Sequence, residues 1–402
     1  MALNNLSLLH RAWRVLPPGL RRDAFTRVSA VLAPRPDLPP PAAQRGLAVG
    51  GEISRASGLG EAARLLLAGL ESLGVPNWRF EAGPVAPRGA QLPPAGVPLL
   101  MVVNAPVLPA ALLRLPRGAL RGRRVVANWY WELPVAPPNW APGARFVHEL
   151  WVPSRFTQAA LEPLMPGRVR VVSLPVAVTP PHPSALRRAD FGLPDHVFLV
   201  LTSFNLASSF ARKNPLAAIE AFRAAFGRAT DVLLLLKVSH IENFPADMAL
   251  LRGAIGDAPN IRLETRVFPA SDSHALTACA DAVLSLHRSE GFGLVPAEAM
   301  ALGKPVIATD WSGTTDFLDD SCAIPVPYQL VPARDPRGVF EAPGAVWAQA
   351  DVGAAAEALR RLHAEPGLRA RLGDSARRAV MTRLGTDSLA AAVRGLGLGL
   401  PA

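Results

Sequence analysis

Residues 289–308 read Ser-Glu-Gly-Phe-Gly-Leu-Val-Pro-Ala-Glu-Ala-Met-Ala-Leu-Gly-Lys-Pro-Val-Ile-Ala, and this stretch decides the fold. Residues 282–286 before it and 306–308 at its end are apolar runs of strand length. Between the two runs, Pro296 suits the first turn of a helix and Gly303 suits its C-terminal cap. Because a strand, a glycine turn, a helix and a second strand follow one another, the stretch predicts a βαβ unit of a parallel sheet.

Two carboxylates, Glu290 and Glu298, flank the start of this predicted helix. No Ser, Thr, Asp or Asn stands just before the helix to cap its free N–H groups. The positive end of the helix could therefore receive a phosphate group from a ligand. The alternative is a glycine turn inside an ordinary βαβ unit with two surface carboxylates, and the spacing alone leaves both interpretations open.

The composition predicts two globular domains and argues against several classes of protein. The chain has 402 residues, of which 50% are hydrophobic and 18% charged, so each of two domains can bury a core. The net charge is +10, but no basic run is interleaved with aromatic residues, which argues against nucleic acid and favours a phosphate-bearing ligand or a membrane surface. The two cysteines lie in apolar surroundings, which indicates reduced thiols and a cytoplasmic protein. No apolar run approaches the roughly 18 residues of a membrane span.

Residues 1–45 predict an N-terminal arm of one or two short helices, broken at Pro17-Pro18 and followed by a proline-rich stretch. The apolar side chains and arginines of its first part could touch the inner face of a membrane. These residues are Leu6, Leu8, Leu9, Arg11, Trp13 and Arg14. The alternative is a helix that packs on the protein itself.

Two α/β domains follow the arm. Apolar strand patterns alternate with helical patterns over residues 46–180 and again over residues 187–385. Alternation of this kind is typical of a parallel sheet covered by helices. The proline-rich residues 175–186 indicate the linker between the domains. A helix within residues 386–402 closes the chain.

A glycine motif lies near the start of the first domain. Residues 58–63, Gly-Leu-Gly-Glu-Ala-Ala, match the dinucleotide pattern G-x-G-x-x-A, and Glu81 lies at the spacing where that pattern has an acidic residue. A dinucleotide fold turns directly from strand into these glycines, whereas a loop intervenes here. We therefore expect Gly58 and Gly60 to admit a phosphate or a sugar closely, and a nicotinamide site is the alternative.

An aromatic cluster follows another strand of the first domain. Residues 128–134 read Asn-Trp-Tyr-Trp-Glu-Leu-Pro, and Asn104 ends the preceding strand. Aromatic faces beside a carboxylate and an amide are a common way to hold a sugar. Trp131, Glu132 and Asn104 are therefore predicted to bind an acceptor, and a buried aromatic anchor between strands is the alternative.

Two cations, Arg212 and Lys213, lie beyond the predicted strand at 197–204 and before a helix that Asn214 is expected to cap. Open α/β sheets bind ligands beyond the carboxyl ends of their strands. Two cations at this edge suit a diphosphate. A solvated basic pair is the alternative.

Together these motifs resemble the signature of the retaining family 4 glycosyltransferases, which have the GT-B fold. The resemblance is carried by the E-x7-E element from Glu290 to Glu298, by Phe-Ala-Arg-Lys-Asn-Pro at 210–215, by Ser-Leu-His-Arg-Ser-Glu at 285–290, and by Trp-Glu-Leu-Pro at 131–134. The last three segments are similar to members that act on bacterial surface glycans. The resemblance extends over residues 45–390 and is more specific in the C-terminal half.

The resemblance implies two Rossmann-like domains that face each other across a cleft, with the nucleotide sugar held mainly by the second. Glu298 would bind the ribose hydroxyls, Glu290 the hydroxyls of the donor sugar, and Lys213 the diphosphate. Arg212 would replace the family's usual arginine, at whose position this chain has Ser208. The donor would also meet Gly58 and Gly60 and the backbone N–H groups of Gly291, Phe292, Gly293 and Leu294.

The expected reaction is the transfer of a hexose from a UDP- or GDP-sugar to a glycan or lipid-linked acceptor. The departing nucleoside diphosphate needs fixed positive charge, which Arg212, Lys213 and the helix start at Pro296 can supply. The sequence has no D-x-D or H-E-x-x-H motif, so no metal and no cofactor are expected. The alternatives are a nicotinamide-dependent oxidoreductase, a non-catalytic nucleotide-sugar-binding protein of the same fold, and a phosphorylase or epimerase.

Overall fold

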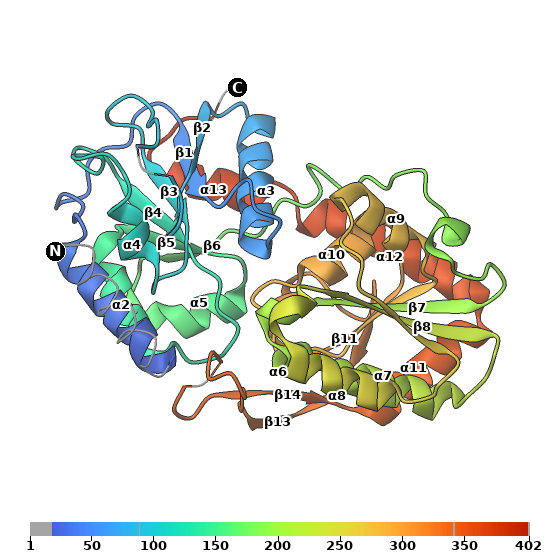
Figure 1. The fold of residues 1–402 in the computed structure, drawn as a ribbon. Helices are drawn as coiled ribbons and strands as arrows, with labels where there is room; N and C mark the ends of the chain where they lie inside the picture. The colour runs from blue at the N-terminus through green and yellow to red at the C-terminus, as the bar shows by residue number, and fades with distance from the viewer. Residues whose placement is uncertain (1–17, 88, 341, 401–402) are drawn as a thin grey trace.

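The computed structural model describes residues 18–400 except residues 88 and 341. It contains two α/β domains that lie side by side, each built on a parallel six-stranded sheet (Figure 1). The predicted fold class, α/β with two Rossmann-like domains, is confirmed. The residues predicted to touch a membrane, Leu6, Leu8, Leu9, Arg11, Trp13 and Arg14, lie outside the described residues.

The sheet of the first domain has the strand order β2-β1-β3-β4-β5-β6. Its strands are β1 (Leu47–Gly51), β2 (Asn77–Glu81), β3 (Leu99–Val102), β4 (Val125–Asn128), β5 (Glu149–Val152) and β6 (Val169–Val171). β1, β3, β4 and β5 are buried along their whole length, in keeping with sequences that are apolar except for Asn128 in β4 and Glu149 in β5. From β1 the chain first adds β2 on one side, at the edge of the sheet, and then adds β3 on the other side. The strand order therefore reverses between β1 and β3.

The sheet of the second domain has the strand order β12-β11-β10-β7-β8-β9. Its strands are β7 (Phe198–Asn205), β8 (Val232–Ser239), β9 (Ile261–Glu264), β10 (Ala282–Ser285), β11 (Val306–Thr309) and β12 (Ile324–Val326). The order reverses between β7 and β10, as in dinucleotide-binding folds. The predicted βαβ unit is therefore present as β10, α10 and β11.

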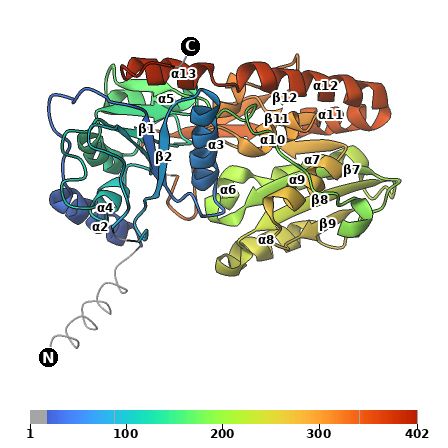
Figure 2. The ribbon, with the colours of Figure 1, turned by 90° about the horizontal axis from the view of Figure 1, so that it is seen from above.

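Helices cover both faces of each sheet and connect the strands (Figures 1 and 2). The α-helices are α2 (Pro18–Leu32), α3 (Gly58–Ser72), α4 (Leu108–Leu112), α5 (Arg155–Leu161), α6 (Phe210–Lys213), α7 (Pro215–Phe226), α8 (Pro245–Ile255), α9 (Ala270–Cys279), α10 (Leu294–Ala301), α11 (Val352–Ala364), α12 (Pro366–Arg383) and α13 (Asp387–Gly395). The 3₁₀ segments are η1 (Pro138–Phe146), η2 (Glu162–Leu164), η3 (Arg188–Phe191), η4 (Leu206–Ser208), η5 (Ile241–Asn243) and η6 (Ser312–Asp316). Among the described residues no helix combines the length and the apolar character that crossing a bilayer requires.

The chain passes between the domains twice. The first passage follows β6, and the second separates α12, in the second domain, from α13, which lies over the first domain (Figure 2). The two passages contact each other, since Ala177 N donates to Leu384 O at 3.0 Å. α13 packs against α3, where a Cβ added to Gly69 would lie 2.7 Å from Leu389 Cδ2.

A hairpin of the second domain also reaches the first domain. β13 (Tyr328–Pro332) and β14 (Val346–Ala350) pair antiparallel along the lower edge of the molecule in Figure 1. Phe340, Ala345 and Trp347, in and after the connection, are buried in the hydrophobic core of the first domain. The sequence analysis does not predict this hairpin, because β13 is short and largely exposed and so lacks a recognisable apolar pattern.

Candidate active site

The candidate site lies where the strand order of each sheet reverses. In the second sheet the reversal falls between β7 and β10, and open α/β sheets bind ligands in the crevice at this point. The segment after β7 carries Arg212 and Lys213, and the segment after β10 carries Glu290. A hydrogen bond of 2.8 Å from Arg288 N to Arg212 O joins the two segments. The fold thus brings together three residues that the sequence predicts as catalytic.

Glu290 lies at the centre of a buried ion cluster. Its Oε1 is 2.5 Å from Lys213 Nζ, and its Oε2 is 3.1 Å from Arg212 Nη1. Burial by itself would raise the pKa of Glu290, but the charges of Lys213 and Arg212 outweigh burial and lower the pKa to about 2. Burial also lowers the pKa of Lys213, and the attraction of Glu290 opposes that change. Glu290 is therefore ionised at neutral pH and can accept hydrogen bonds.

Arg212 is held inside this cluster, whereas Lys213 is more accessible. The side chain of Arg212 is 1% exposed, and that of Lys213 is 18% exposed. The guanidinium group of Arg212 donates to Ser289 O at 2.7 Å and to the hydroxyl of Ser208. It also packs on the ring of Phe340, from the hairpin connection, at 4.9 Å. The position where the family has an arginine thus holds a serine that accepts from Arg212.

The residues predicted to bind an acceptor lie near the reversal point of the first sheet. Glu132 reaches the ion cluster, since its Oε1 is 3.8 Å from Arg212 Nη2, and burial raises its pKa. Trp131 is buried in aromatic packing. Asn104 exchanges two hydrogen bonds, of 2.8 and 3.1 Å, with the backbone of Tyr130. In this arrangement Trp131 and Asn104 hold the loop that presents Glu132.

The turn after Glu290 contacts the first domain directly. Gly291 O accepts hydrogen bonds from the hydroxyls of Ser154, at 2.7 Å, and Thr157, at 3.3 Å, at the start of α5. Ser154 also caps α5, since its Oγ accepts from Thr157 N at 3.2 Å. The hydroxyl contacts across the domain interface carry no signal in the sequence, because they depend on how two distant segments meet.

The start of α10 leaves backbone N–H groups available. Gly293 has a φ of 104°, and an added Cβ would lie 2.4 Å from Thr314 Cγ2, so the turn requires glycine here. α10 begins at Leu294 without a side-chain cap, as the sequence predicts. The side chain of Phe292 is buried against Phe317 and anchors the turn. The uncapped N-terminus of α10 is therefore a fixed partial positive charge beside Glu290.

Glu298, the second carboxylate of the motif, lines a cavity of about 280 Å³ between the domains. The lining residues are Glu61, Leu65, Val176, Thr179, Pro180, Pro181, His182, Ala270, Ser271, His274 and Glu298. Burial, and to a lesser extent the negative charge of Glu61, raise the pKa of Glu298 to about 8. Glu61 and the two histidines are polar lining residues that the sequence analysis does not assign to the site.

Gly58 and Gly60 occupy the first turn of α3, where Ser57 caps the helix by accepting from Gly60 N at 3.1 Å. A Cβ added to Gly60 would lie 2.4 Å from Arg55 O, so close packing with the preceding loop requires this glycine. The nearest atom to a Cβ at Gly58 is Leu294 Cδ1, at 4.0 Å, on the second domain. Only Gly58 therefore borders the space at the start of α10.

The second domain matches a known family. Residues 206–364 match the family described as glycosyl transferases group 1. The second domain is therefore a group 1 glycosyltransferase domain, and the chain as a whole has the GT-B fold. Among curated proteins no match was found.

Solved structures share the two-domain architecture of this glycosyltransferase at low sequence identity. Anabaena Alr3699/HepE in complex with UDP and glucose is 14% identical, with a TM-score of 0.61 over 87% of this chain and 98% of that chain. Sucrose-phosphate synthase from Thermosynechococcus elongatus is 19% identical, with a TM-score of 0.59 over 88% and 98%. The S. aureus TarM G117R mutant, in complex with Fondaparinux, alpha-GlcNAc-glycerol and UDP, is 12% identical, with a TM-score of 0.53 over 76% and 56%. The glycosyltransferase thus spans 56% of the length of TarM.

Two features of the glycosyltransferase near Lys213 differ from the sequence prediction. Arg212 and Lys213 end the short helix α6, which the sequence analysis does not predict. Asn214 precedes α7, whose first residue is Pro215, but its side chain does not cap the helix as the sequence predicts. Its backbone has a φ of 53°, and its Nδ2 donates instead to the carbonyl oxygen of Leu286, just after β10, at 3.0 Å. This bond helps to join the segments that carry Lys213 and Glu290.

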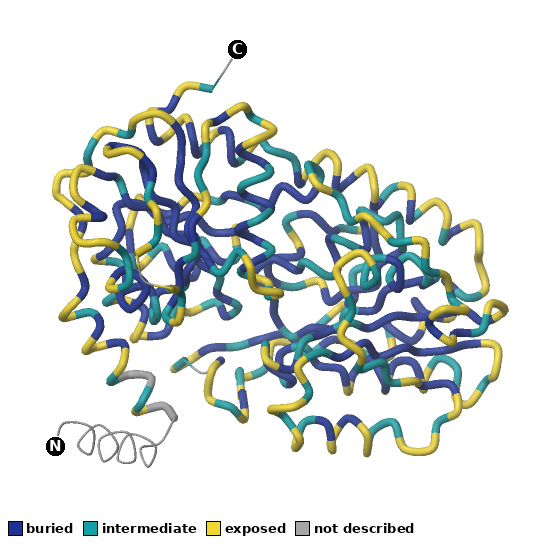
Figure 3. The backbone as a smooth tube through the Cα atoms, turned by 45° about the horizontal axis from the view of Figure 1, so that its top comes forward, coloured by how far each residue is buried: buried dark blue, intermediate teal, exposed yellow. Residues whose placement is uncertain are grey.

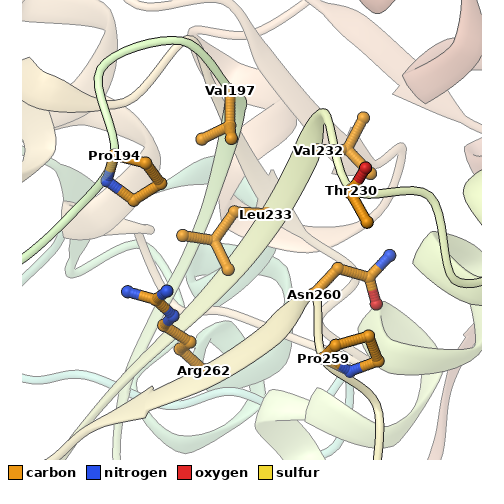
Figure 4. Close-up of a pocket in the computed structure, with 8 residues that line it drawn as sticks. All are labelled: Pro194, Val197, Thr230, Val232, Leu233, Pro259, Asn260 and Arg262. Atoms are coloured by element: carbon orange, nitrogen blue, oxygen red, sulfur yellow. The ribbon is translucent and has the colours of Figure 1, made fainter.

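A second, smaller cavity lies away from the candidate site. A cavity of about 90 Å³ lies at the amino ends of β7, β8 and β9, opposite the reversal point (Figure 4). It is lined by Pro194, Val197, Thr230, Val232, Leu233, Pro259, Asn260 and Arg262. Within residues 18–400, leaving out 88 and 341, no three His, Cys, Asp or Glu side chains are grouped so that they could hold a metal ion.

Proposed function

We propose that this glycosyltransferase moves a hexose from a UDP- or GDP-sugar to a glycan or lipid-linked acceptor, with retention of anomeric configuration and without a metal ion. The observation that carries the proposal is the Glu290–Lys213 pair, which lies where the segments after β7 and β10 meet and beside the uncapped start of α10. A carboxylate, an accessible ammonium group and free helix N–H groups at one point match the hydroxyls and the diphosphate of a nucleotide sugar.

In the proposed reaction the donor diphosphate draws Lys213 away from Glu290. Arg212 remains on Glu290 and keeps its carboxylate ionised, so that Glu290 can accept hydrogen bonds from the donor sugar. As the bond between the anomeric carbon and the diphosphate breaks, Lys213 and the N-terminus of α10 stabilise the charge on the leaving group. The acceptor hydroxyl bonds to the same face of the anomeric carbon, and its proton passes to the leaving phosphate oxygen, so that no separate base is needed.

The remaining predicted residues fit one path for the donor. The ribose would lie at Glu298, in the cavity of about 280 Å³. The sugar and diphosphate would follow the backbone from Gly291 through Phe292 and Gly293 to Leu294, opposite Gly58, while Gly60 supports the turn that presents Gly58. UDP is the favoured nucleotide, because structures of the similar proteins HepE and pneumococcal GtfA contain UDP.

The acceptor would bind to the first domain, where Glu132 faces the ion cluster. We assign residues 1–45 to an accessory arm, 46–180 to the acceptor domain, 187–385 to the nucleotide-sugar domain and 386–402 to a returning helix. The contact between α13 and α3 supports the last assignment. A lipid-linked acceptor would place the enzyme in the cytoplasm at the inner face of the membrane.

The test combines donor binding with turnover of defined variants. The full chain is screened by thermal shift against UDP, GDP, their sugars and NAD(H), because a ligand that binds the folded state raises the melting temperature. Lys213→Ala and Glu290→Ala are then assayed for release of the nucleoside diphosphate. We expect each to lower turnover by a factor on the order of 100 to 1,000, since each removes a charge that acts on the transition state.

Lys304→Ala and Glu220→Ala serve as matched controls, because both residues lie away from the ion cluster. Wild-type turnover by Lys213→Ala or Glu290→Ala would overturn the site assignment. A shift with NAD(H) alone would favour an oxidoreductase, although Glu81 is already engaged by Ser54 through its N–H at 2.9 Å and its hydroxyl at 2.5 Å. A shift with UDP and no turnover in any protein would indicate a binding protein.

A further inference from the structure

Helix α2 packs with its apolar side outward. Its large exposed side chains are Leu20, Phe25, Val28, Val31 and Leu32, and Val31 is 82% exposed. Among the helix positions whose side chains are described, Thr26 and Ser29 are buried, and Ala33 is buried just beyond the end of the helix. At 100° per residue the exposed apolar side chains span an arc of about 140°. A helix of a globular protein normally turns such a stripe toward the core, so the orientation of α2 calls for a partner outside the domain.

The buried side of α2 is attached by small and polar residues. Thr26 Oγ1 donates to Pro106 O at 3.1 Å, and Ser29 Oγ donates within the helix to Phe25 O at 2.7 Å. α2 packs on α4 and η1, the segments that follow the carboxyl ends of β3 and β4 (Figure 1). It therefore lies along the edge of the sheet that carries Asn104 and Glu132. Figure 3 shows the exposed positions along this helix.

Two exposed arginines flank the apolar stripe, and the exposed Asp37 lies beside its far end. Arg27 and Arg35 are exposed beside it, and Leu38, 80% exposed, extends it beyond the helix. Residues 1–180 contain 20 basic and 9 acidic residues, whereas residues 181–402 contain 22 basic and 23 acidic residues. The whole positive net charge of the chain therefore resides in the part that carries α2.

We propose that α2 binds the surface of an anionic lipid bilayer and lies in the plane of the interface. The apolar stripe would enter the boundary of the acyl chains, and the flanking arginines would contact the headgroups. The positive net charge of the first domain favours an anionic bilayer over a second copy of the chain, because two positively charged first domains would repel each other.

The placement of α2 also bears on the acceptor, and this step rests on the proposed function. A bilayer against α2 lies at the edge of the sheet where Glu132 faces the ion cluster. An acceptor sugar on a lipid carrier would then meet the active site from the membrane side. Among the two proposed acceptor classes, the orientation of α2 therefore favours the lipid-linked one.

The experiment is sedimentation of the full chain with vesicles of phosphatidylcholine, with and without phosphatidylglycerol. We expect binding to anionic vesicles that weakens with salt, and binding at least about tenfold weaker to neutral vesicles. Val28→Glu with Val31→Glu should lower binding to anionic vesicles by at least about tenfold. Arg27→Gln with Arg35→Gln should weaken binding less and reduce its salt dependence.

Leu250→Glu with Met381→Glu is the matched control, because these side chains are 58% and 57% exposed on the second domain. The control should bind vesicles like the wild type, and all variants should keep the thermal shift with UDP. Equal vesicle binding by the wild type and the α2 variant would overturn the proposal. A lower melting temperature of the α2 variant without vesicles would also overturn the proposal, because it would show that the chain itself covers the stripe. A wild-type dimer that dissociates in the α2 variant would overturn it as well. Loss of the UDP shift in every protein would overturn the donor assignment and leave the vesicle result standing.

Discussion

The two glutamates of the E-x7-E segment have opposite electrostatic surroundings. Glu290 is paired with Lys213 and Arg212, and its pKa is lowered to about 2. Glu298 lines a cavity that it shares with Glu61, and its pKa is raised to about 8. Burial acts in the same direction on both, so the difference comes from the neighbouring charges. The spacing of the motif therefore determines the positions of the two carboxylates, whereas the charged side chains around each carboxylate determine its protonation state.

This difference separates two tasks within one site. A fixed negative charge at Glu290 suits hydrogen bonds from sugar hydroxyls and keeps two cations in place. A neutral carboxyl group at Glu298 avoids a second negative charge in a cavity that already contains Glu61. Both groups can bind hydroxyls, but their contributions to stability change with pH in opposite directions.

The largest expected effect follows from removing the cation shared by the cluster. Arg212→Leu leaves Glu290 and Glu132 without their buried guanidinium partner, and should lower the free energy of unfolding by about 3–5 kcal/mol. Urea unfolding measures this change. Arg228→Leu removes an exposed ion pair with Asp257 and should leave the unfolding curve unchanged. Equal effects of the two substitutions would show that the cluster is not held together by its charges.

The second effect concerns Glu298 and has a defined sign. The folded protein keeps a proton on Glu298 up to about pH 8, whereas the unfolded chain keeps it only up to about pH 4.5. Folding takes up a proton between these values, so the contribution of Glu298 to stability falls as pH rises through this window. Glu298→Gln should therefore raise the melting temperature by about 2–4 °C above pH 8, and by less near pH 5.

Glu290 provides the opposite case for this measurement. Its folded pKa of about 2 lies below the reference value of 4.5, so its stabilisation is present above pH 4.5 and is lost as pH falls toward 2. Glu290→Gln should therefore lower the melting temperature at neutral pH. If both glutamine variants shift the melting temperature in the same direction at neutral and alkaline pH, the comparison between the two glutamates is wrong.

The smallest expected effect tests the source of the raised pKa. Glu61→Gln removes the negative charge that acts on Glu298, so the pKa of Glu298 should fall toward its usual range. The melting temperature of this variant should then decrease less between pH 6 and pH 9 than that of the wild type, by about 1–2 °C. Glu71→Gln, at an exposed position of the same helix, is the control. An unchanged pH profile in Glu61→Gln would assign the shift to burial alone.

The sequence predicts much of the second half of the site, because its signals are local. The glycines around Phe292, the uncapped start of α10 and Pro215 at the start of α7 follow from backbone preferences of single residues. The strand patterns place Lys213 beyond the carboxyl end of β7 and Glu290 beyond the carboxyl end of β10. These two ends are adjacent because β7 and β10 are parallel neighbours in the sheet. The accessibility of Lys213 compared with Arg212 does not follow, because it depends on Phe340 from a distant hairpin.

The sequence alone determined the α/β class, the βαβ unit around residues 289–308 and the positions of the two glutamates. Each of these depends on the period of apolar residues or on the conformational preferences of glycine and proline, which act over a few neighbouring residues. Only the tertiary structure decided the protonation of Glu290 and Glu298, the contact of Ser154 with Gly291 and the outward stripe of α2. Charge and exposure at these positions are set by segments far apart in the chain, and no local pattern encodes how such segments meet.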